Sequence, residues 1–321
     1  MIINLFFYSM KRITFTEYAR VCIEKLEREG RYSTAHLYSN ALRSYTEYLN
    51  KPIVQFRDFS RHKLRLYERW LIDRNKRSNN ISTYMRMLRN LYNKGVDVGY
   101  TVYVIRLFHD VYTGVDTTHK KSLPRKELHT LLYKDPGTDI LRTTQYTARL
   151  LYQLCGMPFV DLAHIRNSDV IDGVLVYHRI KTGVKVCVKI LQPVVYTMLS
   201  LRRLNLHQKK KSSVYALGIL SGKYMMKTHP GYSEYQSALR GFNAKLSLLA
   251  EKLGVSSRIS TYTLRHSWAT TAKKTGASIE MISELLGHKS IRTTQIYLSS
   301  FNAVKLANVN RKACYYAANI N

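Results

Sequence analysis

The chain has 321 residues, and its 51 Lys and Arg against 21 Asp and Glu give a formal charge of +30 at pH 7. Hydrophobic residues make up 45% of it, which is enough to build folded cores and excludes a disordered basic tail. So large a positive charge is not typical of a metabolic enzyme. Because Lys and Arg placed on phosphates release condensed counterions, we expect nucleic acid as the partner, with an anionic membrane surface as the alternative.

The four cysteines are scattered, with no CxxC pair and no histidines at metal-ligand spacing. This pattern predicts no disulfide framework, no metal site and no cofactor. The apolar start, residues 1–10, is too short to span a bilayer and lacks the charged region and cleavage site of a secretion signal. We therefore expect a cytoplasmic protein that does not enter membranes, with residues 1–12 as an N-terminal appendage and a misassigned start of the first ten residues as the alternative.

Residues 13–111 are expected to form a first, helical domain. Apolar residues recur there at helical spacing, and glycine or proline stops follow them. The expected helices are Thr14–Glu29, a helix capped by Ser33 that ends before Pro52, a helix after Ser60, and a helix that opens at Asn80 or Ser82 and ends at Gly95. Four helices of this length predict a small bundle.

A polar, basic segment at residues 112–124 reads as an exposed linker to a second domain, residues 125–301. In that domain, residues 174–180 and 184–191 alternate with period two around a Lys-Thr-Gly turn, which predicts a β-hairpin. The other expected elements are helices at residues 126–132, 141–154, 194–206, 233–253, 261–274, 278–286 and 290–301. The predicted fold class is mainly α with a small antiparallel β-sheet (α+β), followed by a tail at residues 302–321.

Three residues near the C-terminal end of this domain suit phosphoryl transfer. Arg265 lies at the edge of a helical apolar stripe, His288 follows a glycine at a helix end, and Tyr297 lies one helix later, with Thr293 one turn behind it. A guanidinium can hold two phosphate oxygens, an imidazole can shuttle a proton, and a phenol oxygen can attack phosphorus. Each residue alone is more often structural, so the ordered set carries the interpretation.

The motifs RHSWAT, LLGH and TTQIY, which contain Arg265, His288 and Tyr297, closely resemble the C-terminal signature of the tyrosine recombinase (phage integrase) family. Tyr297 follows His288 by nine residues, as the family's nucleophile follows its histidine. The resemblance implies a helical core-binding domain and a catalytic domain that close as a C-shaped clamp on DNA. It also implies metal- and ATP-independent strand exchange through a 3′-phosphotyrosyl bond, with an integrase or an invertase as the biological role.

The resemblance assigns a general acid to the hairpin, where Lys181 occupies the family's lysine position. Two positions depart from the family pattern: Pro158 stands where the first arginine is usual, and Tyr262 stands where the H-x-x-R box has histidine. Tyr262 can still hydrogen-bond a phosphate oxygen. For the missing arginine we expect Arg179 as the replacement, because period-two geometry puts it on the same face as Lys181, with Arg149 as the next candidate.

The resemblance also implies the partners. We expect double-stranded DNA with specific core sites, a homotetramer on two such sites that is monomeric in solution, accessory DNA-bending proteins, and association with the nucleoid when the protein is bound to DNA. The tail is expected to dock on a neighbouring protomer, with packing in cis as the alternative. The candidate DNA contacts are Arg74, Lys76, Arg77, Arg149 and Lys185.

Three other functions remain open on sequence grounds. A relative that has lost catalysis through Pro158 would bind or bridge recombination sites without cleaving them. A basic RNA-binding protein would explain the charge, but it would not explain the ordered set of Arg265, His288 and Tyr297. A type IB topoisomerase shares the chemistry, yet the motif text favours a recombinase. The target DNA sequence, and the choice between integration, excision and inversion, do not follow from the chain.

Overall fold

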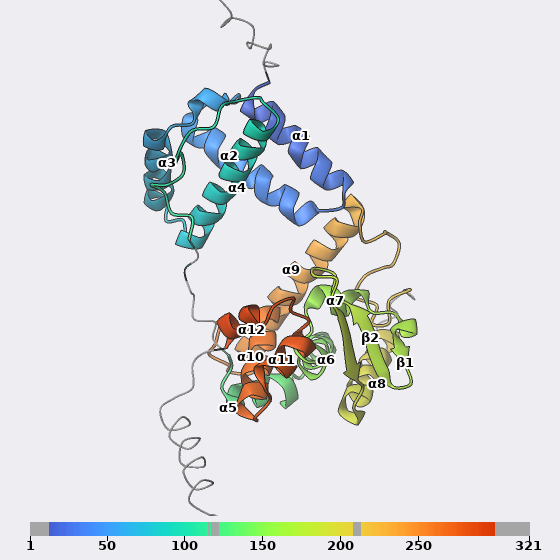
Figure 1. The fold of residues 1–321 in the computed structure, drawn as a ribbon. Helices are drawn as coiled ribbons and strands as arrows, with labels where there is room; N and C mark the ends of the chain where they lie inside the picture. The colour runs from blue at the N-terminus through green and yellow to red at the C-terminus, as the bar shows by residue number, and fades with distance from the viewer. Residues whose placement is uncertain (1–12, 115, 117–121, 208–212, 299–321) are drawn as a thin grey trace, which may run out of the picture. The chain divides into compact units, whose positions relative to one another are not determined.

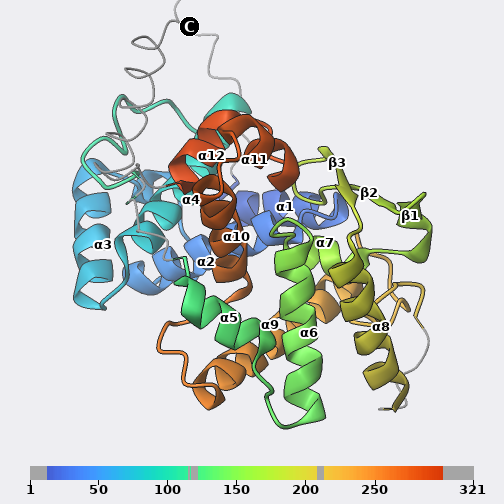
Figure 2. The ribbon, with the colours of Figure 1, turned by 90° about the horizontal axis from the view of Figure 1, so that it is seen from below.

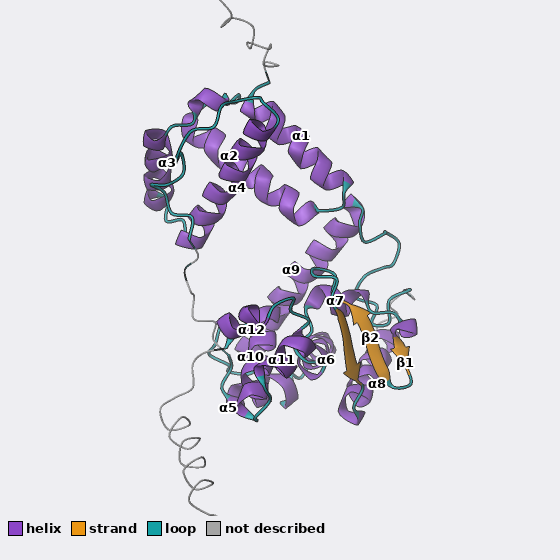
Figure 3. Ribbon diagram, viewed as in Figure 1, coloured by secondary structure: helices purple, strands orange, loops and turns teal. Residues whose placement is uncertain are grey.

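The computed structural model describes residues 13–114, 116, 122–207 and 213–298, apart from the side chains of Leu206, His207, Ile296 and Tyr297. The fold is mainly helical with one small antiparallel sheet, which confirms the predicted fold class (Figures 1 and 3). The chain divides into two compact units, Met1–Thr118 with Met225–Tyr232, and His119–Tyr224 with Ser233–Asn321. The expected appendage and tail, residues 1–12 and 302–321, lie outside the described residues.

The helices of the first unit begin where polar side chains satisfy their free N–H groups. Thr14 and Glu17 form a capping box at the start of α1, and the Ser60 side chain accepts a hydrogen bond from the Lys63 N–H at the start of α3. The elements are α1 (Phe15–Arg28), α2 (Tyr32–Leu49), a short 3-10 helix (Phe56–Asp58), α3 (Arg61–Asp73) and α4 (Ser78–Asp97).

Helix α4 differs from its prediction at both ends. It begins at Ser78, before either expected cap, and it continues through Gly95, the expected stop. A Cβ on Gly95 would lie 2.5 Å from Cε1 of Phe56, so this glycine lets an aromatic ring pack against the helix. Gly95 therefore serves packing rather than helix termination.

Aromatic rings fill the core of the first unit. The ring of Phe59 has its centre 4.5 Å from that of Phe15, 4.8 Å from that of Tyr45 and 5.4 Å from that of Tyr92. The Tyr45 hydroxyl satisfies its hydrogen bond by donating to the Asp58 carbonyl at 3.1 Å. Such contacts between helices distant in sequence hold the bundle together.

The second unit is built around α6, which contacts α5, α8 and α10 (Figure 2). Its elements are α5 (Arg125–Tyr133), α6 (Asp139–Gln153), α7 (Phe159–His164), a 3-10 helix (Asn167–Asp169), β1 (Val170–Ile171), β2 (Val174–His178), β3 (Lys185–Lys189), α8 (Gln192–His207), α9 (His229–Lys252) from Ser233 onward, α10 (Thr261–Lys274), α11 (Ile279–Leu286) and α12 (Ile291–Tyr297). The short elements α7 and β1 were not predicted from the sequence.

The sheet has the order β1-β2-β3, with antiparallel pairs throughout. The predicted hairpin is confirmed, with Val176 opposite Cys187 and His178 opposite Lys185. Both strands are shorter than expected, because β2 ends at His178 and β3 begins at Lys185. The residues between them form a longer turn, and this turn carries part of the candidate site.

Candidate active site

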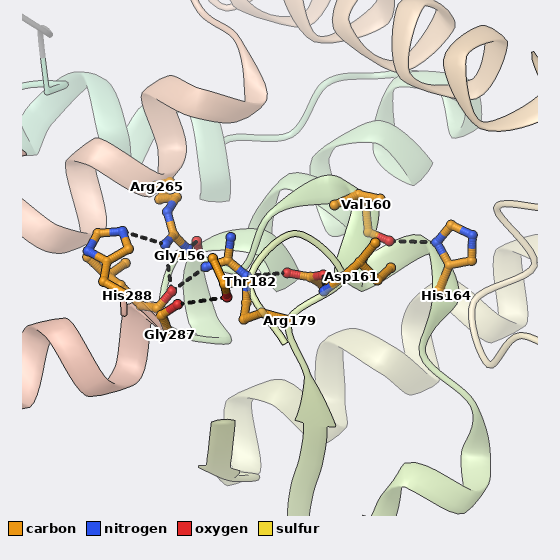
Figure 4. A network of polar contacts seen from close by, with 11 residues as sticks. Gly156, Val160, Asp161, His164, Arg179, Thr182, Arg265, Gly287 and His288 are labelled. Atoms are coloured by element: carbon orange, nitrogen blue, oxygen red, sulfur yellow. Dashed lines mark hydrogen bonds and ion pairs between the residues drawn. The ribbon is translucent and has the colours of Figure 1, made fainter. Parts of the chain in front are cut away.

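Arg265 is held inside the second unit by two backbone carbonyls. It lies in α10, whose first turn is capped by the Ser260 side chain, and only 4% of it is exposed. Its Nη1 donates to the Gly156 carbonyl at 2.8 Å and its Nη2 to the Leu286 carbonyl at 2.7 Å (Figure 4). The guanidinium plane is therefore fixed between the α6–α7 turn and the end of α11.

The end of α11 is shaped by Gly287. This residue adopts a left-handed conformation, φ +62°, and ends the helix with hydrogen bonds from Gly287 N–H to Glu284 O and from His288 N–H to Ser283 O. The turn directs the Leu286 carbonyl toward the arginine and delivers the next side chain, His288, beside it. His288 Nε2 lies 3.1 Å from Nη2 of Arg265.

The turn between α6 and α7 approaches α10 closely enough to require glycine. Cys155 and Gly156 both have positive φ, +58° and +65°. A Cβ on Gly156 would lie 3.2 Å from Cα of Arg265 and 3.3 Å from its carbonyl oxygen. The two residues therefore bring the polypeptide backbone, and the Gly156 carbonyl, against Arg265. Pro158 follows as the cap of α7 and offers the site no donor.

Arg179 converges on the same carbonyl as Arg265. It lies just beyond β2, is 6% exposed, and donates through Nη1 to the Leu286 carbonyl. Its Nε lies 2.7 Å from Oδ2 of Asp161, in an ion pair whose N–H bond does not point straight at the oxygen. Figure 4 shows Arg179 between the carboxylate of α7 and the end of α11. The hairpin arginine proposed from the sequence thus lies beside Arg265 and His288.

Asp161 fixes both the side chain and the turn of the hairpin. Its Oδ1 accepts the backbone N–H of Ile180 at 2.9 Å, while Oδ2 pairs with Arg179. Burial raises the pKa of this carboxyl above its ordinary value, and the Ile180 N–H and the charges of Arg179 and Arg265 act in the opposite direction. The turn is fastened a second time where the Thr182 hydroxyl donates to the Gly287 carbonyl at 3.2 Å.

The negative end of a helix thus faces two guanidinium groups. The last carbonyls of a helix lack intrahelical partners and carry partial negative charge, so Arg179 and Arg265 satisfy the end of α11. Donors aimed at one oxygen from two directions also suit a phosphate, whose oxygens accept the same kind of hydrogen bond. The two guanidinium groups, rather than the helix end itself, therefore make a candidate anion site here.

Two other expected site residues stay outside this cluster. Lys181 is exposed, whereas Arg179 is buried, so the expectation that they share a face is wrong: β2 ends at His178, and the turn directs the two side chains differently. Tyr262 is 54% exposed at the start of α10, with its ring 5.7 Å from that of His266.

In this structure the Arg149 side chain contacts other parts of the second unit. It is 8% exposed, and both Nε and Nη2 donate to the Leu132 carbonyl. Its guanidinium carbon lies 4.6 Å from the ring centre of Tyr133 and 4.9 Å from that of Tyr146. Arg149 therefore joins α6 to α5, because burial among a carbonyl and two rings leaves it a structural role.

The remaining DNA-binding candidates are exposed. Arg74 lies 3.8 Å above the Trp70 ring and 2.8 Å from Glu47 Oε1, whereas Lys76 and Arg77 precede α4. Lys185 begins β3 in the second unit and is also exposed. These four residues lie on the surface of their own units, where contacts to a nucleic acid remain a prediction.

Tyr297 is the last residue of α12, and its side chain lies outside the described atoms. The same helix reaches the site through Thr294, whose Oγ1 lies 2.9 Å from Nδ1 of His288 and which has no exposed surface. The hydroxyl beside His288 therefore comes from Thr294, a residue to which the sequence analysis assigned no role.

Sequence reasoning missed three polar residues of the site: Asp161, Thr182 and Thr294. Asp161 stands in the box examined for an arginine, three residues after Pro158, and its charge in an otherwise apolar run was the available signal. The two threonines give no signal of their own, since their partners lie on other elements. Within the described part of the chain, no cluster of metal-ligating side chains occurs and no helix is long and apolar enough to cross a bilayer.

Sequence models of two known families match this chain. The sequence model of the phage integrase family matches residues 121–303, and that of the phage integrase SAM-like domain matches residues 14–104. Tyrosine recombinase XerD of Corynebacterium glutamicum is 48% identical over 54 residues, which are 17% of this chain and 18% of that protein. Tyrosine recombinase XerC of Leptospira interrogans is 42% identical over 74 residues, 23% of this chain and 24% of that protein. The matches thus span less than a quarter of these relatives.

Solved structures show the same fold. A lambda integrase dimer bound to a COC′ core site has a TM-score of 0.65 at 15% identity, covering 89% of this chain and 95% of that one. The Tn1549 transposon integrase in complex with circular intermediate DNA has a TM-score of 0.62 at 13% identity, covering 93% and 99%. The phage integrase family model matches more than half of this chain, so the chain belongs to the phage integrase family of tyrosine recombinases.

Proposed function

We propose that this chain is a site-specific recombinase, an integrase or a DNA invertase, that cuts and rejoins DNA through a 3′-phosphotyrosyl intermediate on Tyr297. The observation that carries the proposal is the meeting of Arg265 and Arg179 at the Leu286 carbonyl, with His288 in contact with Arg265. Two guanidinium groups and an imidazole form a site for a phosphodiester. The helix that ends in Tyr297 reaches this site through Thr294.

In the proposed cleavage step, the phenol oxygen of Tyr297 attacks phosphorus and forms a new P–O bond. The bond between phosphorus and the 5′-oxygen breaks, and its electron pair leaves with that oxygen. The phenolic proton passes to Nε2 of His288, and the 5′-oxygen takes a proton from Lys181. The phosphotyrosyl bond keeps the energy of the bond it replaces, so religation is the reverse reaction and consumes neither ATP nor a metal ion.

Arg265 and Arg179 would hold the non-bridging oxygens, on which negative charge develops. In this proposal Arg179 takes the role that the family gives to an arginine at the position of Pro158, and Asp161 positions it. The loss of one such donor costs about 2.7–4 kcal/mol of transition-state stabilisation in comparable sites. Tyr262, at the exposed start of α10, would add a hydrogen bond to a phosphate oxygen.

We propose double-stranded DNA with specific core sites as the substrate, bound by the two units as a C-shaped clamp. Arg74, Lys76, Arg77 and Lys185 would contact phosphates, which position the protein without reading sequence. A neighbour of the same fold, lambda integrase, has been solved as a tetramer bound to a Holliday junction. By analogy four copies, monomeric in solution, would assemble on two sites at the nucleoid, assisted by DNA-bending proteins and by the tail docked in trans.

The test is to isolate DNA covalently attached to the protein from cells that express it, and to sequence the attached ends. The wild type should yield recurrent ends, and Tyr297→Phe should yield none, because the variant lacks the attacking oxygen. Tyr103→Phe is the matched control: this tyrosine is 66% exposed in the first unit and should leave the adducts unchanged. Two recovered sites in inverted orientation would indicate an invertase.

Failure to recover adducts from the wild type, together with salt-sensitive DNA binding, would refute the catalytic proposal. It would favour the second candidate, a relative that binds or bridges recombination sites. The observation that supports this alternative is Pro158, which offers no donor at the position of the family's first arginine.

A further inference from the structure

Both ring nitrogens of His288 have a partner in the structure. Nε2 lies 3.1 Å from Nη2 of Arg265, and Nδ1 lies 2.9 Å from Oγ1 of Thr294. The partners come from different helices, α10 and α12, and Thr294 has no exposed surface. The imidazole is therefore clamped between a cation and a buried hydroxyl.

The chemistry of these partners decides where the ring proton lies. A guanidinium has only N–H donors, so the nitrogen that faces Arg265 has to accept a hydrogen bond. A neutral imidazole carries one N–H, and with Nε2 as the acceptor that N–H is on Nδ1. Nδ1 then donates to the Thr294 hydroxyl. Before a phosphate binds and the proposed cleavage protonates Nε2, a doubly protonated ring would turn an N–H toward the N–H groups of Arg265, so the neutral ring is favoured in the resting site.

From this geometry we infer that Thr294 is a positioning residue that holds His288 in its Nδ1–H tautomer. Its catalytic meaning rests on the proposed function. Because the Thr294 hydroxyl accepts the Nδ1 N–H, the lone pair of His288 is on Nε2, on the side of Arg265, where a phosphate would bind. The hydroxyl is also carried by α12, three residues before Tyr297, so one hydrogen bond connects the nucleophile's helix with the proton acceptor.

Three variants of the full chain test this inference. Thr294→Val keeps the size and β-branching of the side chain and removes the hydroxyl. Thr294→Ser keeps the hydroxyl, and Thr293→Val makes the same change at the preceding position, which is exposed. One readout is the pair of ¹⁵N chemical shifts of the His288 ring, assigned with His288→Gln. The other is the rate at which phosphotyrosyl adducts form.

In the wild type, the ring spectrum at a pH where His288 is neutral should show a protonated Nδ1 and an unprotonated Nε2. Thr294→Val should give a mixture of tautomers and slow adduct formation by about 10- to 100-fold, because the proton acceptor is presented for only part of the time. Thr294→Ser should restore both readouts, and Thr293→Val should leave both unchanged.

A wild-type spectrum with the proton on Nε2 would overturn the inference, even if Thr294→Val failed to fold. So would a folded Thr294→Val with the wild-type spectrum and rate. A failure of the proposed function looks different: the wild type would form no adduct, while its ring spectrum would still report the tautomer. The two ideas therefore fail on separate measurements.

Discussion

Nε of Arg179 lies 2.7 Å from Oδ2 of Asp161, and the two side chains are 7% and 1% exposed. The pair connects the hairpin turn with α7, the helix that begins after Pro158. A buried ion pair is seldom a large source of stability, because desolvation of both charges offsets their attraction. Here the ion pair contributes orientation, because the Asp161 carboxylate directs the Arg179 guanidinium toward the end of α11.

Removal of the carboxylate should therefore harm both stability and function. We expect Asp161→Asn to lower the free energy of unfolding by about 3–5 kcal/mol, because the Arg179 charge would stay buried without its counter-charge. Urea denaturation measures this loss. The double variant Asp161→Leu with Arg179→Met should recover most of the stability while adduct formation stays lost. A double variant that cleaves DNA at the wild-type rate would show that Arg179 takes no part in catalysis.

A side chain at Gly287 should displace Arg179. A Cβ there would lie 2.6 Å from Cγ of Arg179 and 2.8 Å from Cγ2 of Val186, at a φ of +62°. Gly287→Ala should cost about 1 kcal/mol for the left-handed backbone and a further 1–3 kcal/mol for the overlap. Gly183→Ala is the control, because Gly183 has φ +71° and nothing within 4 Å of its Cβ position. Equal losses of stability in Gly287→Ala and Gly183→Ala would argue against the close approach of Arg179 to Gly287.

Lys76 should contribute one phosphate contact to DNA binding. Lys76→Ala should reduce the slope of log K against log salt by about 0.9 in magnitude and weaken binding similarly for all DNA sequences. Arg142→Ala serves as a control, since Arg142 is held by Asp135 at 2.9 Å and Asp139 at 2.7 Å. Titration of labelled DNA at several salt concentrations measures both slopes. An unchanged slope in Lys76→Ala would place this lysine off the DNA.

The cysteines should differ in reactivity. Burial raises the pKa of the Cys155 thiol to about 11, whereas Cys187 is exposed on β3. At pH 8 only about 0.1% of a thiol with that pKa is thiolate, the form that reacts with iodoacetamide. Peptide mass spectrometry should find Cys187 alkylated in the native protein and Cys155 only after denaturation. Early alkylation of Cys155 would mean that the turn before α7 opens readily.

The sequence alone predicted those features of the candidate site that depend on a single helix or hairpin. Local periodicity and helix stops predicted the hairpin and the helices that carry Arg265 and precede His288, whereas the ordered set of residues and the family resemblance marked these two as candidates. Arg179 was proposed for a different reason from the one the structure gives. Period two placed it on the same face of the hairpin as Lys181, but the strand ends first and the arginine turns inward to Asp161.

The remaining features depend on contacts between elements. Asp161 acts through a residue 18 positions later in the chain, and Thr294 through the preceding glycine turn, so neither could be identified from its own surroundings. Gly95 illustrates the opposite error, because a glycine that accommodates Phe56 looks in sequence like a helix stop. A pattern shows which face is apolar, and tertiary packing decides which polar groups meet.

Two hydrogen bonds hold the hairpin turn and limit how Lys181 can move. The residue before it, Ile180, gives its N–H to Asp161, and the residue after it, Thr182, gives its hydroxyl to Gly287. Because both neighbouring residues are held, we expect Lys181 to move by rotation about its side-chain bonds and not by displacement of the loop. Such rotations take picoseconds to nanoseconds, whereas loop displacement is slower. In the proposed mechanism, proton delivery by Lys181 should therefore keep pace with bond breaking without waiting for the backbone.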